Sequence, residues 1–286
     1  MIFNLGEKMK RKVITFLTVL VGILGIFSTN STQIQAKSKN NNKPVVIYLT
    51  RHGETTANVM HLAQGWSDYT LTDNGVKGAE YLGKGLKGTK FKAAYSGDLS
   101  RQEKTARGAL DYSGNKKIKV KTDERLRECN YGSYEGRPDV AKNVPEIAAY
   151  FGYDSIDDFV KKEGKLFQNK MQDGYYALDQ QNKLNTNLPE QYRAENRAES
   201  SQVVEKRMTD VLTEIAKKHQ RKGGNVLVVS SGMSINLFLS TQNFPSFEGK
   251  GLANDSVTKL IYQNGKFKLS GEIGSLEYYN NGMKAK

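Results

Sequence analysis

Four side chains have the types and the order that suit the chemistry of a phosphate ester: Arg51, His52, Arg101 and Glu128. Arginine matches phosphate oxygens with paired N–H donors. A neutral imidazole can attack phosphorus to form a covalent phosphoenzyme, and a carboxylic acid can protonate the departing alcohol. Since phosphoryl transfer depends mainly on positioning and charge stabilisation, these residues could perform it without a metal or other cofactor.

Each of these residues has a more ordinary explanation when it is considered alone. A histidine after a strand is usually solvated or capped, Arg51 could be a surface arginine, and Glu128 could form a salt bridge. The joint occurrence in this order favours the chemical interpretation. The sequence has no Gly-x-Ser-x-Gly and no P-loop order, and its three scattered histidines do not have the spacing of metal ligands.

The candidate residues follow short apolar runs that are typical of buried parallel strands. The segments are residues 51–55 after the strand predicted at 45–49, residues 95–101 at the end of the strand predicted at 93–96, and residues 230–232 after a strand at 226–229. A fourth segment, residues 126–128, precedes a glycine-rich stretch. In open α/β sheets, ligands bind beyond the carboxyl ends of the strands. We therefore expect these segments to meet at one edge of a sheet.

Helices predicted between these strands complete the expected fold. The segments are a helix at 73–86 capped by Thr72, helices at 98–110, 199–219 and 232–239, and a strand at 118–120. Asn264-Gly265 between runs at 256–262 and 266–269 is a strong hairpin signal. This alternation predicts a three-layer α/β/α sandwich with a mostly parallel central sheet and an antiparallel edge hairpin.

Residues 137–198 differ in composition from the rest of the chain. They are polar, with scattered aromatic residues, and their apolar side chains have helical spacing: Ile156, Phe159, Val160, Phe167 and Met171. A helical insertion is therefore expected within a domain at 44–280, followed by a tail at 281–286.

The N-terminal sequence predicts export from the cell. Basic residues precede an apolar run at 13–27, and a polar stretch ends at the small residue Ala36. This pattern predicts a signal peptide at 1–36, removed to leave a secreted or cell-surface protein with a flexible lead-in at 37–43. The alternative is an uncleaved membrane anchor, although the run is short for a membrane span. The one cysteine, Cys129, excludes an internal disulfide.

The formal net charge of +13 indicates an anionic partner. Nucleic acid, an anionic cell-wall polymer, a membrane surface or a phosphorylated substrate would all fit. The lysines are scattered along the sequence, and no zinc-finger or RNP-type signature accompanies them. A solvated basic surface without nucleic acid is therefore the preferred interpretation, with a wall polymer kept as an alternative partner. The oligomeric state is left open.

The sequence resembles a known family, the phosphoglycerate-mutase-like proteins of the histidine phosphatase superfamily. The resemblance rests on five blocks in order over about residues 44–280: Arg51-His52-Gly53-Glu54-Thr55 with Asn58 and Gln64-Gly65-Trp66; Tyr95-Ser96-Gly97-Asp98-Leu99 with Arg101 and Thr105-Ala106; Leu126-Arg127-Glu128 with Gly132 and Glu135-Gly136; Glu199-Ser200 with Arg207; and Asn254 with Ser256-Val257.

The resemblance implies a role for each matching residue. His52 would become phosphorylated, Arg51 and Arg101 would hold the phosphoryl oxygens, and Glu128 would donate the proton to the leaving group. Further substrate-binding positions would be Gly53, Thr55, Asn58, Ser231 and Gly232. The insertion would lie over the pocket and help to select a small phosphorylated substrate.

One departure from the family pattern is serious. Family members usually carry a second histidine where this chain has Ser231. Loss of one preorganised donor typically costs about 10²–10³-fold in rate. Of the remaining histidines, His61 could substitute only in part, and His219 would favour the C-terminal dipole of its helix.

Two hypotheses follow. The first is an exported phosphomonoesterase that works through a phosphohistidine at His52, and the intact catalytic set favours it. The second is a catalytically weak or inactive member that binds a phosphorylated ligand or an anionic wall polymer, and Ser231 and the basic surface favour it. A mutase is less expected, because export separates the protein from glycolytic intermediates.

Overall fold

The structure, a computed structural model, describes residues 42–181 and 198–285. The predicted leader, most of the lead-in and the later part of the insertion lie outside these ranges. Within the ranges, no helix combines the length and the apolar character that a membrane span requires.

Six strands form one mixed sheet in the order β3-β2-β4-β1-β5-β6. Their bounds are β1 Val45–Arg51, β2 Phe91–Ser96, β3 Val120–Thr122, β4 Gly224–Ser230, β5 Val257–Gln263 and β6 Lys266–Leu269. The first four are parallel, with Val45 opposite Gly224 and Arg51 opposite Ser230 in the central pair. β5 and β6 are antiparallel. The mostly parallel sheet with an antiparallel edge hairpin is thereby confirmed.

Two local details test the turn chemistry of the sequence. Asn264 and Gly265 have φ values of 53° and 80°, the left-handed pair that a tight hairpin turn requires. The strand predicted at 118–120 begins later, at Val120, because Ile118 belongs to the preceding turn. There its amide donates to Asn115 and its carbonyl accepts from Arg107.

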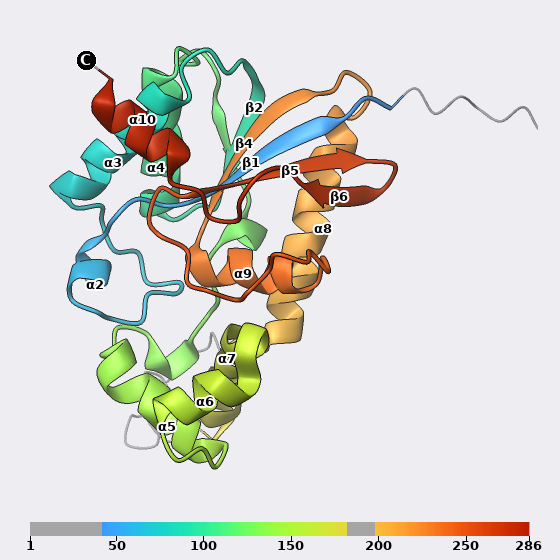
Figure 1. Cartoon of the computed structure of the whole chain (residues 1–286). Coiled ribbons are helices and arrows are strands. Elements are labelled where there is room, and N and C mark those ends of the chain that lie inside the picture. Colours follow the sequence, from blue (N-terminus) through green and yellow to red (C-terminus); the bar gives the residue numbers. More distant parts are fainter. Residues whose placement is uncertain (1–41, 182–197, 286) are drawn as a thin grey trace, which may run out of the picture. The chain divides into compact units, whose positions relative to one another are not determined.

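Helices cover both faces of the sheet, which confirms the three-layer arrangement (Figure 1). The helices α3 Asp73–Gly85, α4 Ser100–Tyr112 and α10 Glu277–Lys284 lie on one face, and α8 Ser201–His219 and α9 Gly232–Ser240 lie on the other. Leu82, Leu110 and Leu227 belong to the core of the first face, and Met208 and Val228 to that of the second. Burial of both sheet faces explains the continuous apolar runs of β1 and β4.

Helix α10 was not predicted, and it extends into residues that the sequence analysis assigned to a tail. It packs on α3 through two glycines. A Cβ atom at Gly282 would lie 1.6 Å from the carbonyl oxygen of Tyr81, and one at Gly85 would lie 1.8 Å from that of Tyr278. Glycine is unfavourable inside a helix, so tertiary contact rather than local propensity specifies this element.

The segment predicted as a helical insertion contains three helices in its described part: α5 Val144–Tyr150, α6 Ile156–Glu163 and α7 Phe167–Gln180. Ser155 caps α6 by accepting a hydrogen bond from the amide of Asp158. Phe159 and Tyr175 are fully buried among aromatic neighbours. They belong to the same hydrophobic core as the residues of the second sheet face. The part of the prediction that covers residues 182–197 lies outside the described residues.

Candidate active site

His52 follows β1 directly and is buried, with 1% of its surface exposed. Its Nδ1 atom lies 2.8 Å from the carbonyl oxygen of Gly53. A carbonyl oxygen can only accept, so Nδ1 carries the proton and Nε2 keeps a free lone pair. Burial, and then the positive charges of Arg101 and Arg51, hold the pKa of His52 well below its ordinary value of 6.5. The imidazole is therefore neutral and of the tautomer that can act as a nucleophile at Nε2.

Arg51 is the last residue of β1, and its side chain turns towards helix α9. Its Nη1 group donates to the carbonyl oxygen of Leu252, while its buried Nε has no hydrogen-bond partner. A Cβ atom at Gly232 would lie 3.2 Å from both Cδ and Nε of this arginine. The glycine after β4 therefore leaves the room in which the guanidinium lies.

Arg101, in the first turn of α4, has no exposed surface. Nη1 donates to the carbonyl oxygen of Ser67 at 3.0 Å, and Nη2 donates to that of Gly65 at 2.6 Å. Its Nε is buried without a partner, and burial lowers the pKa of the guanidinium. Arg101 forms none of the ion pairs seen among the described residues. A buried and a partly buried guanidinium group, both bonded to neutral carbonyls, form a site that favours an anion.

Glu128 lies in the loop after residue 126, and its carboxylate reaches the N-terminus of α9. Only 6% of its surface is exposed. Oε1 accepts from the amides of Ser234 at 2.7 Å and Cys129 at 2.9 Å, and Oε2 accepts from the amide of Met233 at 3.1 Å. The otherwise unpaired amides of a helix N-terminus suit a carboxylate. These three contacts fix the orientation of the Glu128 carboxyl group.

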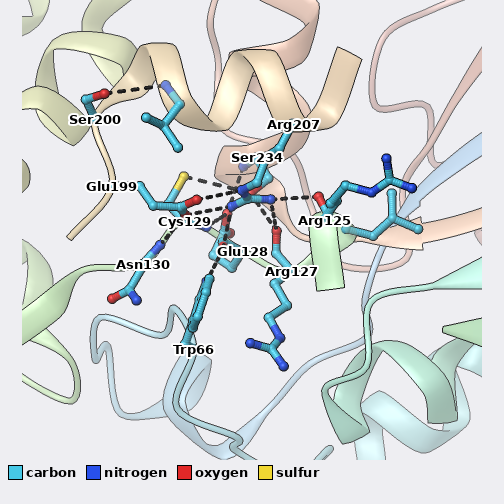
Figure 2. Close-up of polar contacts among 12 residues, drawn as sticks. Trp66, Arg125, Arg127, Glu128, Cys129, Asn130, Glu199, Ser200, Arg207 and Ser234 are labelled. Carbon is cyan, nitrogen blue, oxygen red and sulfur yellow. Dashed lines mark hydrogen bonds and ion pairs between the residues drawn. The ribbon is translucent and has the colours of Figure 1, made fainter. Parts of the chain in front are cut away.

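A third arginine fixes the main chain on either side of Glu128 (Figure 2). Arg207 of α8 forms a bidentate pair with Glu199, with distances of 2.7 and 2.8 Å. Nη1 donates to the carbonyl oxygens of Arg125 and Arg127 at 2.7 and 3.0 Å, and Nη2 also donates to that of Glu128 at 2.9 Å. The Nε1 group of Trp66 donates to the same Glu128 carbonyl at 3.0 Å. The proton-donor candidate is therefore held through its backbone as well as its carboxylate.

A cavity of about 200 Å³ brings part of the predicted set together. Arg51, His52, Asn58, Glu128 and Gly232 line it. Arg101, Gly53, Thr55 and Ser231 are absent from the lining. Sequence reasoning missed the other lining residues: Leu62, Gln64, Tyr131, Asp139, Gln168, Met171, Met233, Asn236, Gly251 and Leu252. Most are apolar or amide side chains, which carry no chemical signal in a single sequence.

Gly53 and Thr55 frame the loop after His52 rather than line the cavity. The amide of Gly53 donates to Thr105 Oγ1 at 2.9 Å. Thr55 caps the short helix α2 (Thr56–Val59) in a capping box with Asn58 and donates to Gln64 Oε1 at 2.6 Å. Their assignment as substrate-binding residues therefore receives no support from the lining of the cavity, and positioning is the role that their contacts favour.

Ser231 is fully buried between β4 and α9. Its Oγ accepts a hydrogen bond of 2.9 Å from Nε2 of Gln102, which also donates to the carbonyl oxygen of Leu126. A Cβ atom at Gly97 would lie only 1.9 Å from Oε1 of Gln102, so the glycine makes room for this amide. The space beside Ser231 is thus filled by Gln102, a residue that the sequence analysis did not single out.

The other two histidines lie away from the cavity. His61 is exposed and does not belong to the lining, so it gives no support to the idea that it substitutes for a second catalytic histidine. His219 ends α8 as expected, and its Nε2 also lies 3.0 Å from the hydroxyl of Tyr95. Within the described residues, no group of three or more His, Cys, Asp or Glu side chains could hold a metal ion.

Asp255 is a buried acid behind the His52 loop that sequence reasoning missed. Its Oδ1 has no hydrogen-bond partner, and a Cβ atom at Gly53 would lie 3.3 Å from it. Burial raises the pKa of this carboxyl group to about 7, against the lowering effect of Arg51. Its φ of 58° is left-handed, a region that Asp and Asn tolerate.

We expect Asp255→Asn to change how stability depends on pH. The unfolded carboxyl group ionises near pH 3.8, whereas the folded group keeps its proton to about pH 7. The wild-type free energy of unfolding should therefore fall between about pH 4 and pH 7, by roughly 3–4 kcal/mol relative to the asparagine variant. Urea unfolding at several pH values measures this, and parallel curves for the two proteins would contradict it.

Comparison with known proteins identifies the family. The model of the histidine phosphatase superfamily (branch 1) matches residues 47–183 and 158–272. Together these ranges cover most of the chain, so the protein belongs to the histidine phosphatase superfamily. The fold and the order of motifs expected from the resemblance are consistent with this membership.

The similar proteins include mutases and phosphatases. Phosphoglycerate mutase from Bacillus anthracis superposes with a TM-score of 0.75 at 30% identity, over 85% of this chain and 99% of that chain. A mycobacterial glucosyl-3-phosphoglycerate phosphatase shares the fold, with a TM-score of 0.54 at 20% identity over 79% and 96% of the two chains. Fructose-2,6-bisphosphatase TIGAR from Bos taurus is 39% identical over 129 residues, which are 42% of this chain and 47% of that protein. This chain therefore spans about half the length of that curated relative.

Proposed function

We propose that the protein is a phosphomonoesterase that works through a phosphohistidine on His52. The observation that carries the proposal is the neutral, buried imidazole with its proton fixed on Nδ1, beside the fully buried Arg101 and the partly buried Arg51. Nε2 attacks phosphorus, and the bond from phosphorus to the ester oxygen breaks. Arg51 and Arg101 stabilise the charge on the phosphoryl oxygens during this transfer.

Glu128 acts as the acid in the first step and as the base in the second. Its protonated carboxyl group gives a proton to the departing oxygen, so an alcohol leaves. The resulting carboxylate then takes a proton from water, whose oxygen attacks the phosphohistidine and releases inorganic phosphate and the free imidazole. Each function in this scheme is assigned to a side chain, so the scheme uses no metal and no other cofactor.

The cavity supports a small substrate. Its volume of about 200 Å³ leaves little room beyond a phosphoryl group and a short alcohol. Asp139, Gln168 and Met171 from the insertion line it opposite the strand ends, and we propose that the insertion selects the alcohol. The names of the relatives, which include a mutase and phosphatases of small phosphate esters, support the same substrate class.

Export and the domain boundaries belong to the same proposal. A leader at 1–36, a lead-in at 37–43 and a superfamily domain from 44 would give a secreted or cell-surface enzyme, with retention of the leader as an anchor as the alternative. N-terminal sequencing of the exported protein distinguishes cleavage after Ala36 from retention of the leader.

Replacement of Glu128 by glutamine should affect substrates according to their leaving groups. An alkyl phosphate needs a proton on its departing oxygen, so kcat should fall by about 10²–10⁴-fold. An aryl phosphate leaves without that proton and should lose far less. Steady-state kinetics on the two ester types measure the difference, with the aryl rate serving as the control for folding. An equal loss on both would remove Glu128 from the role of acid.

The second candidate function, a weak or inactive phosphate-binding member, rests on Ser231 and on Gln102 beside it. Ser231→His alone should lower the free energy of unfolding by about 1–3 kcal/mol, because Gln102 occupies the space that the imidazole needs. It should not raise kcat. Gln102→Ala/Ser231→His opens that space and supplies a donor that can carry charge. We expect this double variant to raise kcat by about tenfold or more over Gln102→Ala.

The same assay separates the two functions. Hydrolysis of an aryl phosphate by the wild type and a gain in the double variant support the enzyme. If both proteins are inactive while inorganic phosphate binds tightly in calorimetry, the chain is a binding protein. A wild type that is clearly active and faster than the double variant would mean that the Gln102–Ser231 pair is suited to its own substrate.

A further inference from the structure

The lysines that are scattered along the sequence gather in space at the edge of the sheet opposite the active site. Parallel strands share one amino edge, and the turns that enter β1, β2, β3 and β4, with the β5–β6 turn, all reach it. We call this surface the basic edge. It comprises Lys43, Lys87, Lys90, Lys92, Lys116, Lys117, Lys119, Lys217, Lys218, Arg221, Lys222 and Lys266, all exposed.

Contacts between the turns show that they form one continuous surface. The amide of Lys43 donates to the carbonyl oxygen of Gln220 at 2.7 Å, and Asn225 donates to that of Lys90 at 3.2 Å. Asn115 donates to the carbonyl oxygen of Thr89 at 2.9 Å. β1 and β4 also begin side by side (Figure 1). The surface therefore extends across all strands of the sheet, roughly 24 Å at the usual strand spacing.

The charge of the basic edge is not compensated locally. Residues 42–44, 86–92, 113–119, 216–225 and 262–266 contain these 12 basic side chains and no acidic one. None of the twelve forms an ion pair within the described residues, and the nearby acids Asp111 and Glu214 are paired with Arg107 and Arg125. The rest of the described chain has 21 basic and 27 acidic residues. The positive charge of the domain is therefore concentrated on this one edge.

Twelve like charges held together raise the free energy of the folded state, so an anionic partner is the simplest reason for the arrangement. The phosphate ester binds at the opposite, carboxyl edge, so the substrate does not explain it. We propose that the basic edge binds the surface of a bilayer that contains anionic phospholipid. This inference is independent of the chemistry at His52.

Three observations favour a lipid surface over other polyanions. Eleven of the twelve residues are lysine, which acts as a point charge, whereas specific phosphate recognition favours the fork of arginine. The Phe and Tyr side chains within these five ranges, Phe91 and Tyr262, are both buried, so neither ring is available to stack on a nucleic-acid base. The edge is a broad set of turns, and none of its residues lines the cavity described above.

The path of the chain agrees with this partner. Lys43, the point at which the described chain enters the sheet, belongs to the basic edge. The apolar run at 13–27 precedes it by 15 residues, a length that spans at most roughly 50 Å. A retained leader, the alternative to cleavage after Ala36, is therefore compatible in chain length with a basic edge that contacts lipid headgroups. The cavity, at the carboxyl edge, would open away from them.

Vesicle binding with matched charge variants tests the proposal on the full chain. The edge variant changes Lys90, Lys117, Lys218 and Lys222 to glutamate. The control variant changes Lys77, Lys104, Lys142 and Lys165 to glutamate, four exposed lysines outside the edge that form none of the ion pairs seen among the described residues. Both variants keep the leader and have the same net charge. Co-sedimentation uses phosphatidylcholine vesicles with or without about one third phosphatidylglycerol.

We expect the edge variant to bind the anionic vesicles about tenfold or more weakly than the wild type, and the control variant to lose much less. A rise from about 0.1 M to about 0.5 M sodium chloride should remove the difference between the variants. Thermal unfolding checks that both variants fold. Equal loss in both variants, wild-type binding that ignores phosphatidylglycerol, or tighter binding to soluble poly(glycerol phosphate) at equal phosphate concentration would overturn the proposal.

Discussion

Replacement of His52 by alanine should lower kcat for an aryl phosphate by about 10⁴-fold or more. In the proposed mechanism the imidazole receives the phosphoryl group, and Asn58, Glu128 and the arginines cannot replace a nucleophile at that position. The structure also shows that no other histidine lines the cavity. The loss should lie in kcat, because the arginines that we propose to bind the phosphate remain in the variant.

His61→Ala is the matched control for this prediction. His61 is exposed, so its removal should leave kcat within about twofold and stability within about 0.5 kcal/mol. Inorganic phosphate binding by His52→Ala, measured by calorimetry, checks that the pocket persists. A His52→Ala protein that keeps more than about a tenth of the wild-type kcat would show that another group attacks the ester.

Replacement of Arg207 by alanine should cause the largest loss of stability, about 3–5 kcal/mol. The side chains of Arg207 and Glu199 are only 12% and 14% exposed, and the pair is bidentate. Without the guanidinium, Glu199 and the carbonyls of Arg125, Arg127 and Glu128 lose their partner. Urea unfolding measures the stability, and kcat should fall as well, because the backbone beside Glu128 is no longer fixed.

Arg125→Ala provides the comparison for an exposed ion pair. Arg125 contacts Asp123 and Glu214 at the surface, where such pairs contribute about 0–1 kcal/mol. Similar losses for Arg207→Ala and Arg125→Ala would contradict the assignment of Arg207 as a buried positioning residue. Restoration of kcat in Arg207→Lys without restoration of stability would separate the charge of this residue from its bidentate geometry.

Most of the fold was predictable because its signals are local. Continuous apolar runs marked β1 and β4, Thr72 marked the start of α3, and Asn264-Gly265 marked the edge hairpin. Helix α10 was missed because Gly282 weakens the helical pattern of its sequence. This glycine allows the close approach of α10 to α3. The basic edge was also missed, because it depends on the tertiary structure. The lysines that form it are separated in the sequence and meet only because parallel strands share one amino edge.

The site was predictable where a residue type implies chemistry. Arg51, His52 and Glu128 were found from their chemistry and order, and all three line the cavity. Ser231 was recognised as a departure, but no local pattern indicates that Gln102 fills the space beside it. Asp255 was also missed, since an acid in a late loop shows neither its burial nor its missing partner until the chain is folded.

Rapid-quench trapping of the phosphoenzyme tests the central claim most directly. Wild-type protein mixed with a labelled aryl phosphate should carry acid-labile phosphate within the first turnover, and alkaline digestion with mass spectrometry should place it on His52. The label should be absent in His52→Ala and preserved in His61→Ala. Phosphate that is incorporated at another residue, or hydrolysis in the wild type with no trapped label at any time, would contradict a phosphohistidine on His52.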